Sequence, residues 1–152
     1  MKKTHFLTAI AFALAASAST VHAHDDAYLD TQKAPHGGQL RMAGLYHLEL
    51  VLDKSSPVIA DKSVLVYVTD HAGQKISTAN ATGSATILAA KAKATVALVP
   101  DGDNRLKGVG RFASTPDMKA VITLTAKGQP PETARFTPLA AMQDEHMDHS
   151  KH

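Results

Sequence analysis

The stretch "LYHLELVL", residues 45–52, alternates between apolar and polar side chains. Successive side chains of an extended chain point to opposite faces, so His47 and Glu49 share one face with Val51. The other face is apolar and consists of Tyr46, Leu48, Leu50 and Leu52. This pattern predicts a half-buried β-strand, with a histidine and a carboxylate side by side on its outer surface.

Short segments of similar character follow along the chain. They are rich in β-branched residues and are separated by turn signals such as "DHAGQ" at 70–74, "DGDN" at 101–104 and "KGQPP" at 127–131. The alanine-rich residues 89–97 could form a helix by propensity, but their alternation favours a strand. "GVGRF" at 108–112 shows only a turn-and-strand pattern. The further expected strands are residues 63–70, 75–77, 83–88, 91–100, 120–127 and 133–139.

About seven short strands with almost no helical periodicity predict an all-β fold. We expect a single antiparallel β-sandwich, immunoglobulin-like, or a small barrel over residues 35–139. Residues 24–34 are polar and end at a proline, which predicts a flexible, extended N-terminal arm. The glycines of "PHGG", residues 35–38, predict a turn before the first strand. Strand signals stop after Leu139, so residues 140–152 are expected to be a flexible tail.

The first 23 residues have the character of a secretory signal. Lys2 and Lys3 precede an apolar stretch at 6–18, and "VHA" at 21–23 supplies small residues for cleavage. An alternative cleavage site follows Ala18 in "ASA". Because the apolar stretch is too short for a good membrane span, we expect a periplasmic protein with no membrane insertion after cleavage.

Composition limits the partners and the ligand chemistry. Without Lys2 and Lys3 the 16 basic residues fall to the number of acidic residues, 14, so a nucleic-acid partner is not expected. The chain has no cysteine. Soft metal ions would therefore have to bind methionine thioethers and histidine nitrogens.

Such groups are concentrated in the last eleven residues, "MQDEHMDHSKH". Imidazole suits Cu(II), Zn(II) and Ni(II), whereas thioether suits Cu(I) and Ag(I). The tail therefore predicts a bound metal ion, copper in the first place, with silver, zinc or nickel as alternatives. The competing interpretation is a solvated acidic terminus without a selected ligand. The predicted ligands are Met142, His146, Met147, His149 and His152.

Three more histidines are candidate metal ligands. Cleavage after Ala23 would make His24 the first residue, and its α-amine and imidazole could chelate one ion together, as in the copper brace of periplasmic copper carriers and lytic polysaccharide monooxygenases. His36 lies in "PHGG", where two glycines allow a close approach to a ligand, and His47 pairs with Glu49 on one strand face. Each is equally consistent with an ordinary turn, strand or terminal histidine. His71 lies in an expected turn, where exposure is the default.

Methionines are less specific. Met42 lies near His36 and His47 in the sequence, and Met118 precedes an expected strand. Either could fill the core, which is the commoner role of methionine.

Four stretches together resemble a known family: "APHGGQLRMAGLYHLELVLD" (34–53), "VLVYVTDHAGQKI" (64–76), "LVPDGDNRLKGVGRF" (98–112) and "TARF" (133–136). They are similar to a small periplasmic β domain associated with the adaptor subunits of heavy-metal resistance-nodulation-division efflux systems, which export copper, silver, cobalt, zinc and cadmium. The pattern also resembles YtkA-like immunoglobulin-type modules. The first resemblance implies a free-standing module that binds or presents metal ions, with His36 and His47 matching the family pattern, and efflux adaptor or pump components as partners.

We therefore expect a periplasmic heavy-metal-binding protein that acts as a carrier or accessory factor in metal resistance or efflux. The alternative is an interaction module that docks onto an efflux or envelope complex and binds no metal. An oxidase or monooxygenase using His24 is not expected. With 5% aromatic residues and no tryptophan, the chain offers little for a substrate surface or a closed redox pocket.

Overall fold

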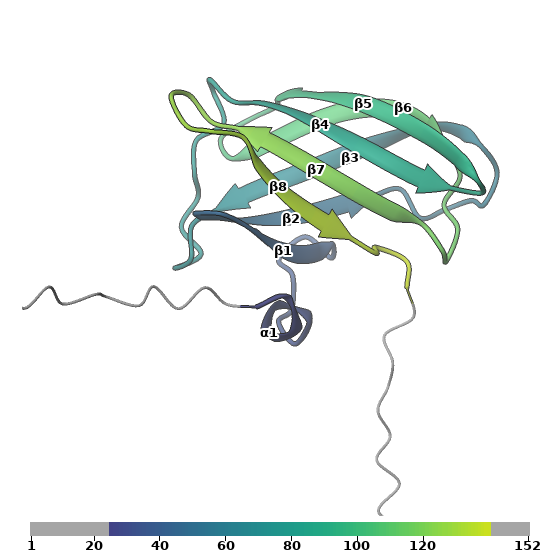
Figure 1. The fold of residues 1–152 in the computed structure, drawn as a ribbon, viewed down its shortest axis with the longest axis horizontal. Helices are drawn as coiled ribbons and strands as arrows, with labels where there is room; N and C mark the ends of the chain where they lie inside the picture. The colour runs from purple at the N-terminus through teal and green to yellow at the C-terminus, as the bar shows by residue number, and fades with distance from the viewer. Residues whose placement is uncertain (1–24, 141–152) are drawn as a thin grey trace, which may run out of the picture.

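The computed structural model describes residues 25–140. In that range one short helix precedes eight β-strands, and the fold is all-β, as predicted (Figure 1). No helix within this range is long and apolar enough to cross a membrane. The elements are α1 (Asp26–Asp30), β1 (Gln39–Ala43), β2 (Tyr46–Leu52), β3 (Ala60–Thr69), β4 (Thr82–Ala89), β5 (Ala92–Pro100), β6 (Arg105–Phe112), β7 (Lys119–Thr125) and β8 (Glu132–Phe136).

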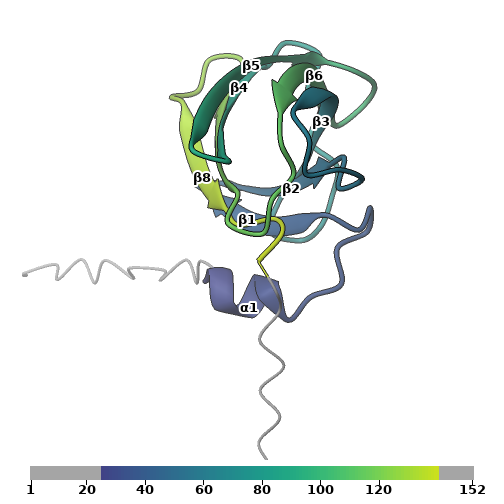
Figure 2. The ribbon, with the colours of Figure 1, turned by 90° about the vertical axis from the view of Figure 1, so that its right-hand side faces the viewer.

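All neighbouring strands are antiparallel, in the order β1-β2-β3-β6-β5-β4-β7-β8. The sheet curls until its two edge strands, β1 and β8, come into contact, and an end-on view shows a nearly closed barrel (Figure 2). The backbone N–H of Thr137, just after β8, donates to the Gln39 side-chain oxygen of β1 at 2.8 Å. Of the two predicted all-β architectures, the barrel describes the molecule better.

The interior of the barrel is filled by the alternate side chains that the strand patterns predict. Leu48 and Leu50 of β2 pack with Val64, Val66 and Val68 of β3, and all five are almost fully buried. Ile87, Leu106, Ile122, Leu124 and Phe136 complete the centre from the other strands. Burying each such side chain contributes roughly 1.5–3 kcal/mol, which fixes the register of every strand.

Two strands were not predicted. β1 follows directly after the expected turn at 35–38, in residues for which no strand was predicted, and β6 includes "GVGRF", whose glycines weaken the strand signal. In β6 the glycines have a packing role: a Cβ atom at Gly108 would overlap the Ala97 carbonyl oxygen, and one at Gly110 would overlap the Val96 side chain. The glycines therefore allow β5 to fold closely over β6 where the sheet turns.

The expected return strand at 75–77 is also absent. The turn after β3 forms as predicted, with the Asp70 N–H donating to the Gln74 carbonyl at 2.9 Å, but pairing ends with a single bridge between Thr69 and Lys75. The chain then continues into β4, which pairs with β5 and β7, while β3 pairs with β2 and β6.

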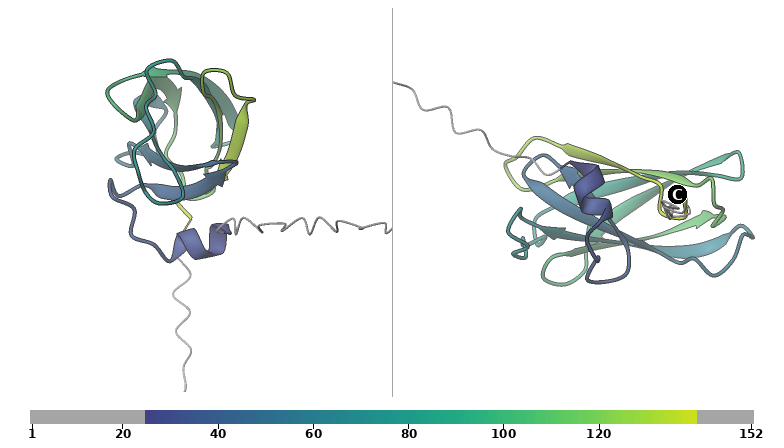
Figure 3. Two further views of the ribbon diagram at one scale, coloured as in Figure 1. Left: turned by 90° about the vertical axis from the view of Figure 1, so that its left-hand side faces the viewer. Right: turned by 90° about the horizontal axis from the view of Figure 1, so that it is seen from below.

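The predicted extended arm was wrong for residues 26–30, which form α1. Asp25 caps this helix by accepting the Tyr28 N–H at 2.8 Å, a role that short polar side chains favour. Asp26 accepts the Met42 N–H at 3.3 Å, and Arg41 pairs with Asp30 at 2.6 Å. α1 therefore lies against the edge of β1 (Figure 3) and supplies a hydrogen-bond acceptor for one backbone N–H of that edge, the N–H of Met42.

Candidate functional site

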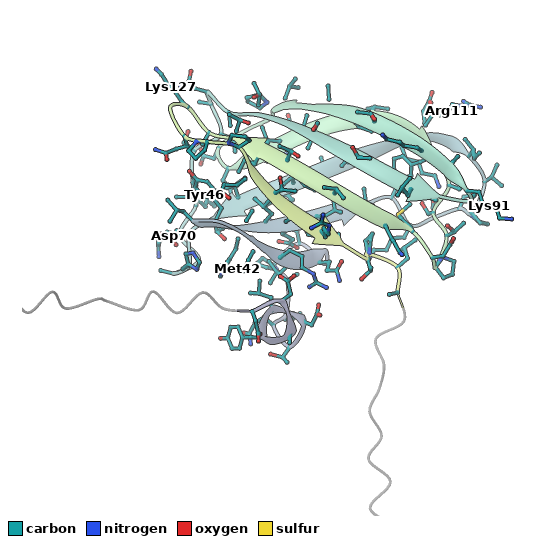
Figure 4. All side chains as sticks on the ribbon, viewed as in Figure 1. Met42, Tyr46, Asp70, Lys91, Arg111 and Lys127 are labelled. Atoms are coloured by element: carbon teal, nitrogen blue, oxygen red, sulfur yellow. The ribbon has the colours of Figure 1, made fainter. Side chains whose placement is uncertain are left out.

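Several polar side chains gather on the outer surface of β1, β2 and β3, near the end where β3 turns at Asp70. Met42, Tyr46 and Asp70 mark this end in Figure 4, with Lys91 and Arg111 at the opposite end. Directly paired residues of an antiparallel sheet project to the same face. One row across the three strands is Met42, His47 and Thr69, and the next is Leu40, Glu49 and Tyr67.

Glu49 is the centre of the second row and is only 3% exposed. One carboxylate oxygen accepts the backbone N–H groups of His36, at 2.8 Å, and of Gly38, at 3.0 Å. The other oxygen lies 2.7 Å from Nδ1 of the His36 ring. A Cβ atom at Gly38 would overlap the Leu50 carbonyl oxygen, so only glycine lets the "PHGG" loop lie this close to β2. The carboxylate thus holds the loop in place.

The His36 ring is also held by stacking. It lies flat on Tyr67, with ring centroids 3.6 Å apart and an interplanar angle of 3°. Arg105 reaches the Tyr67 hydroxyl at 3.4 Å and pairs with Asp101 at 2.7 Å. The hydrogen bond to Tyr67, with a further contribution from Asp101, raises the pKa of Arg105 above its ordinary value. His36 therefore belongs to a bonded and stacked structural network.

His47, in the first row, contacts a histidine from the turn. Its ring meets that of His71 edge to face, with centroids 4.8 Å apart and an interplanar angle of 69°. The Asp70 carboxylate shapes this turn by accepting the N–H groups of Ala72, at 2.9 Å, and Gln74, at 2.8 Å. The sequence predicted exposure for His71, and this was wrong, because its side chain is half-buried. His47, predicted to lie on the outer face of its strand, is only 9% exposed. The turn folds back over β2 and covers it.

The histidines predicted as ligands in the domain are not brought together. His36 is engaged by Glu49, whereas His47 contacts His71. Within residues 25–140, no three histidine or acidic side chains converge closely enough to hold a metal ion. His71 was underrated by sequence reasoning, although the turn motif "DHAGQ" directly after a strand paired with β2 could have placed it. Met118 is a core residue, 1% exposed, while Met42 is half-buried opposite His47.

Six predicted ligands lie outside the residues that the structure describes: His24, Met142, His146, Met147, His149 and His152.

No protein-family model matches this chain, and no curated protein or solved structure is similar enough to count as a match. A functional hypothesis therefore depends on the residues themselves and on their contacts.

Proposed function

We propose that this protein is a periplasmic heavy-metal-binding protein that acts as a carrier or accessory factor in metal resistance or efflux. The metal proposed is copper. It is proposed as a binding protein and not an enzyme. Its partners would be adaptor or pump components of a resistance-nodulation-division efflux system, the class that the sequence resembles. The observation that carries the proposal is the contact between two imidazoles, His47 and His71, beside a methionine of the neighbouring strand.

Two features support a carrier. The closing residues 142–152 supply imidazole and thioether groups on a short segment, and such groups bind late first-row and soft metal ions. His47 lies on a β-strand and His71 lies in the hydrogen-bonded turn after β3, and their rings are already in contact, so metal binding there would require little ordering of the chain. Together they offer places for an ion to be captured and transferred.

The test is a competitive titration of the mature chain with Cu(I), Cu(II), Ag(I), Zn(II) and Ni(II). The matched variant replaces the tail histidines by alanine and the tail methionines by leucine. We expect the unmodified chain to bind copper more tightly than zinc or nickel, and the tail variant to bind fewer equivalents. Absence of binding of every ion below about millimolar concentration would contradict the proposal.

The competing function is an interaction module that docks onto an efflux or envelope complex. Its support is the apolar surface of Val99 and Val109 on neighbouring strands β5 and β6, 59% and 63% exposed. If docking is the function, the tail variant should retain full metal tolerance in cells, whereas a substitution of Val109 by aspartate should abolish it.

A further inference from the structure

We propose that the outer surface of β4, β5, β7 and β8 docks an acidic, partly apolar segment of a protein partner. This inference goes beyond metal binding and does not depend on it. The surface differs from the one that contains Val99 and Val109. It is called the basic face below and consists of Leu88, Lys91, Lys93, Lys119, Val121 and Arg135.

Strand pairing gathers the cations of the basic face. Lys93 of β5 and Lys119 of β7 are the two direct cross-strand neighbours of Leu88 in β4. Arg135 of β8 is paired with Val121, two residues after Lys119, and β4, β7 and β8 lie side by side in Figure 1. Directly paired residues project to the same face with Cβ atoms about 4.5–5.5 Å apart, so Lys93 and Lys119 stand on either side of Leu88. All three cations are exposed.

Acidic side chains are absent from the outward positions of these four strands as the structure describes them. The acidic residue of β8, Glu132, is paired with the core residue Leu124 and therefore has the opposite orientation. Within residues 25–140, no carboxylate forms an ion pair with Lys93, Lys119 or Arg135. The basic face therefore attracts anionic groups over roughly one Debye length, about 8 Å at physiological ionic strength.

A hollow lies at one end of the basic face, between the turn that joins β4 to β5 and the loop before β7. Its volume is about 300 Å³, at the lower end of the range for ligand pockets, about 300–1,000 Å³. Leu88, which is 48% exposed, contributes to its apolar lining. Two cations and one carboxylate complete it. The lining residues are Leu88, Ala89, Lys91, Ala92, Asp117 and Lys119.

The turn beside the hollow has an unusual backbone conformation. Ala90 has a φ of +50° and Lys91 a φ of +61°. Two-residue hairpin turns of this kind favour asparagine and glycine, because other L-residues are strained at positive φ. The chain nevertheless has a lysine here, and its side chain lines the hollow. The strained turn thus adds a cation to the hollow that the residues favoured for its geometry would not supply.

A protein segment fits this surface better than a membrane does. Membrane-surface binding inserts several protruding apolar side chains into the lipid. The basic face instead combines a hollow with one exposed large apolar side chain, Leu88. An extended segment with carboxylates on both sides of an apolar residue can pair with Lys93 and Lys119 while its apolar side chain enters the hollow. Charge and shape together therefore indicate an acidic segment with an apolar residue at its centre.

The experiment measures fluorescence anisotropy of a fluorescein-labelled synthetic peptide in which glutamates flank a central leucine, added to the full mature chain. A second peptide has serine in place of the leucine, and vesicles of phosphatidylcholine and phosphatidylglycerol are tested in parallel. We expect the leucine peptide to bind with a Kd below about 1 mM, and more weakly as salt is added. The serine peptide should bind at least about threefold more weakly.

Charge substitutions locate the binding surface. Lys93→Glu or Lys119→Glu should weaken binding of the leucine peptide by at least about tenfold. Lys107→Glu and Lys127→Glu change the net charge equally but lie outside the basic face, so they should change the affinity by less than about twofold. Asp117→Asn should strengthen binding by about twofold or more, because it removes the carboxylate that repels the peptide. Circular dichroism of each variant establishes that it is folded.

Several results would overturn the proposal. Absence of peptide binding below about 1 mM would do so, as would equal weakening by Lys107→Glu and Lys119→Glu, which would indicate general charge attraction. Equal affinity for the two peptides would overturn the role of the hollow. Binding of the vesicles alone, lost in Lys119→Glu, would identify a membrane surface instead. If the peptide binds only after Asp144, Glu145 and Asp148 are changed to amides, the occupant is the chain's own tail and not a partner.

Discussion

At the scale of single residues, the outer surface of β2 depends on one carboxylate and one glycine. Glu49 is buried and accepts three donors from the loop that contains His36 and Gly38. A buried charge of this kind is tolerated only because its hydrogen bonds are satisfied. The sequence pattern predicted that His47 and Glu49 share a face, and that is how β2 is built. The partner of Glu49, however, is His36, thirteen residues earlier.

Replacing Glu49 by glutamine should destabilise the protein by about 1–3 kcal/mol, because the amide has only one acceptor oxygen for three donors and places an NH₂ group against one of them. Urea unfolding monitored by circular dichroism measures this loss. Asp61→Asn is the matched control, since Asp61 is exposed and only weakly paired with Arg111 at 3.8 Å. Equal stability of the Glu49 variant and the wild-type chain would show that the carboxylate does not hold the loop.

Replacing Gly38 by alanine should cost about 1–3 kcal/mol, because the new Cβ would overlap the Leu50 carbonyl oxygen and lift the loop from β2. Thermal unfolding measures the effect. Gly37→Asn is the control: Gly37 has a φ of +73° and open space around its Cβ position, and asparagine tolerates this conformation. The loop model is contradicted if the Gly37 variant is the less stable of the two.

Asp53 provides a prediction about pH. Hydrogen bonds from Ser55, helped by the charge of Lys62, lower the pKa of this carboxyl below its ordinary value of 3.8. A lowered pKa in the folded state adds stability above the unfolded pKa, and this stability is lost as the pH falls through the folded pKa. Ser55→Ala should therefore move the pKa of Asp53 upward toward 3.8, as measured by NMR titration of the carboxyl carbon. A pKa that does not rise would contradict the role of the serine.

At the scale of elements, the glycines of β6 lie inside a strand and are required for its packing against β5. Gly108 and Gly110 alternate with Val109, whose side chain points to solvent, and their missing side chains make room for β5. Propensity alone depletes glycine from strands, so this element was missed by local reasoning. Whether residues 105–112 form a strand depends on how closely β5 packs against them, and β5 is a separate segment of the chain.

Gly110→Ala should destabilise the barrel by about 1–3 kcal/mol, and adding Val96→Ala should recover part of that loss, because the Val96 side chain is the obstacle. Gly108→Ala should be recovered much less by the same change, since the Ala97 carbonyl oxygen also stands in the way. Chemical denaturation of the single and double variants measures the coupling. Equal recovery in both pairs would contradict the proposed packing of β5 on β6.

At the scale of the whole molecule, the barrel is closed by contacts that lie outside the regular strand pairing. Gln39 accepts the N–H of Thr137 across the seam, and α1 covers the edge of β1 through Arg41. An uncovered edge strand can pair with other chains, so this arrangement also protects the protein against association.

Replacing Arg41 by glutamine should release α1, because the guanidinium joins this helix to β1 through Asp30 at 2.6 Å and Asp26 at 3.7 Å. Hydrogen exchange of the α1 amides and of the Met42 amide should become about tenfold faster or more, while the Val66 amide in the central strand β3 keeps its protection. Arg111→Gln, at an exposed ion pair, should leave all of these rates unchanged. Uniform acceleration of every amide would instead indicate global destabilisation.

The sequence by itself determined the all-β class and the inward face of β2, because the alternation of Leu48, Leu50 and Leu52 with polar residues is a local property of the chain. It also placed most of the other strands and the turn at Asp70. Only the tertiary structure decided that His36 bonds Glu49, that His47 meets His71, and that β3 pairs with β6. These contacts join residues that are far apart in the chain. Their partners are selected by the packing of the whole barrel, which no local pattern encodes.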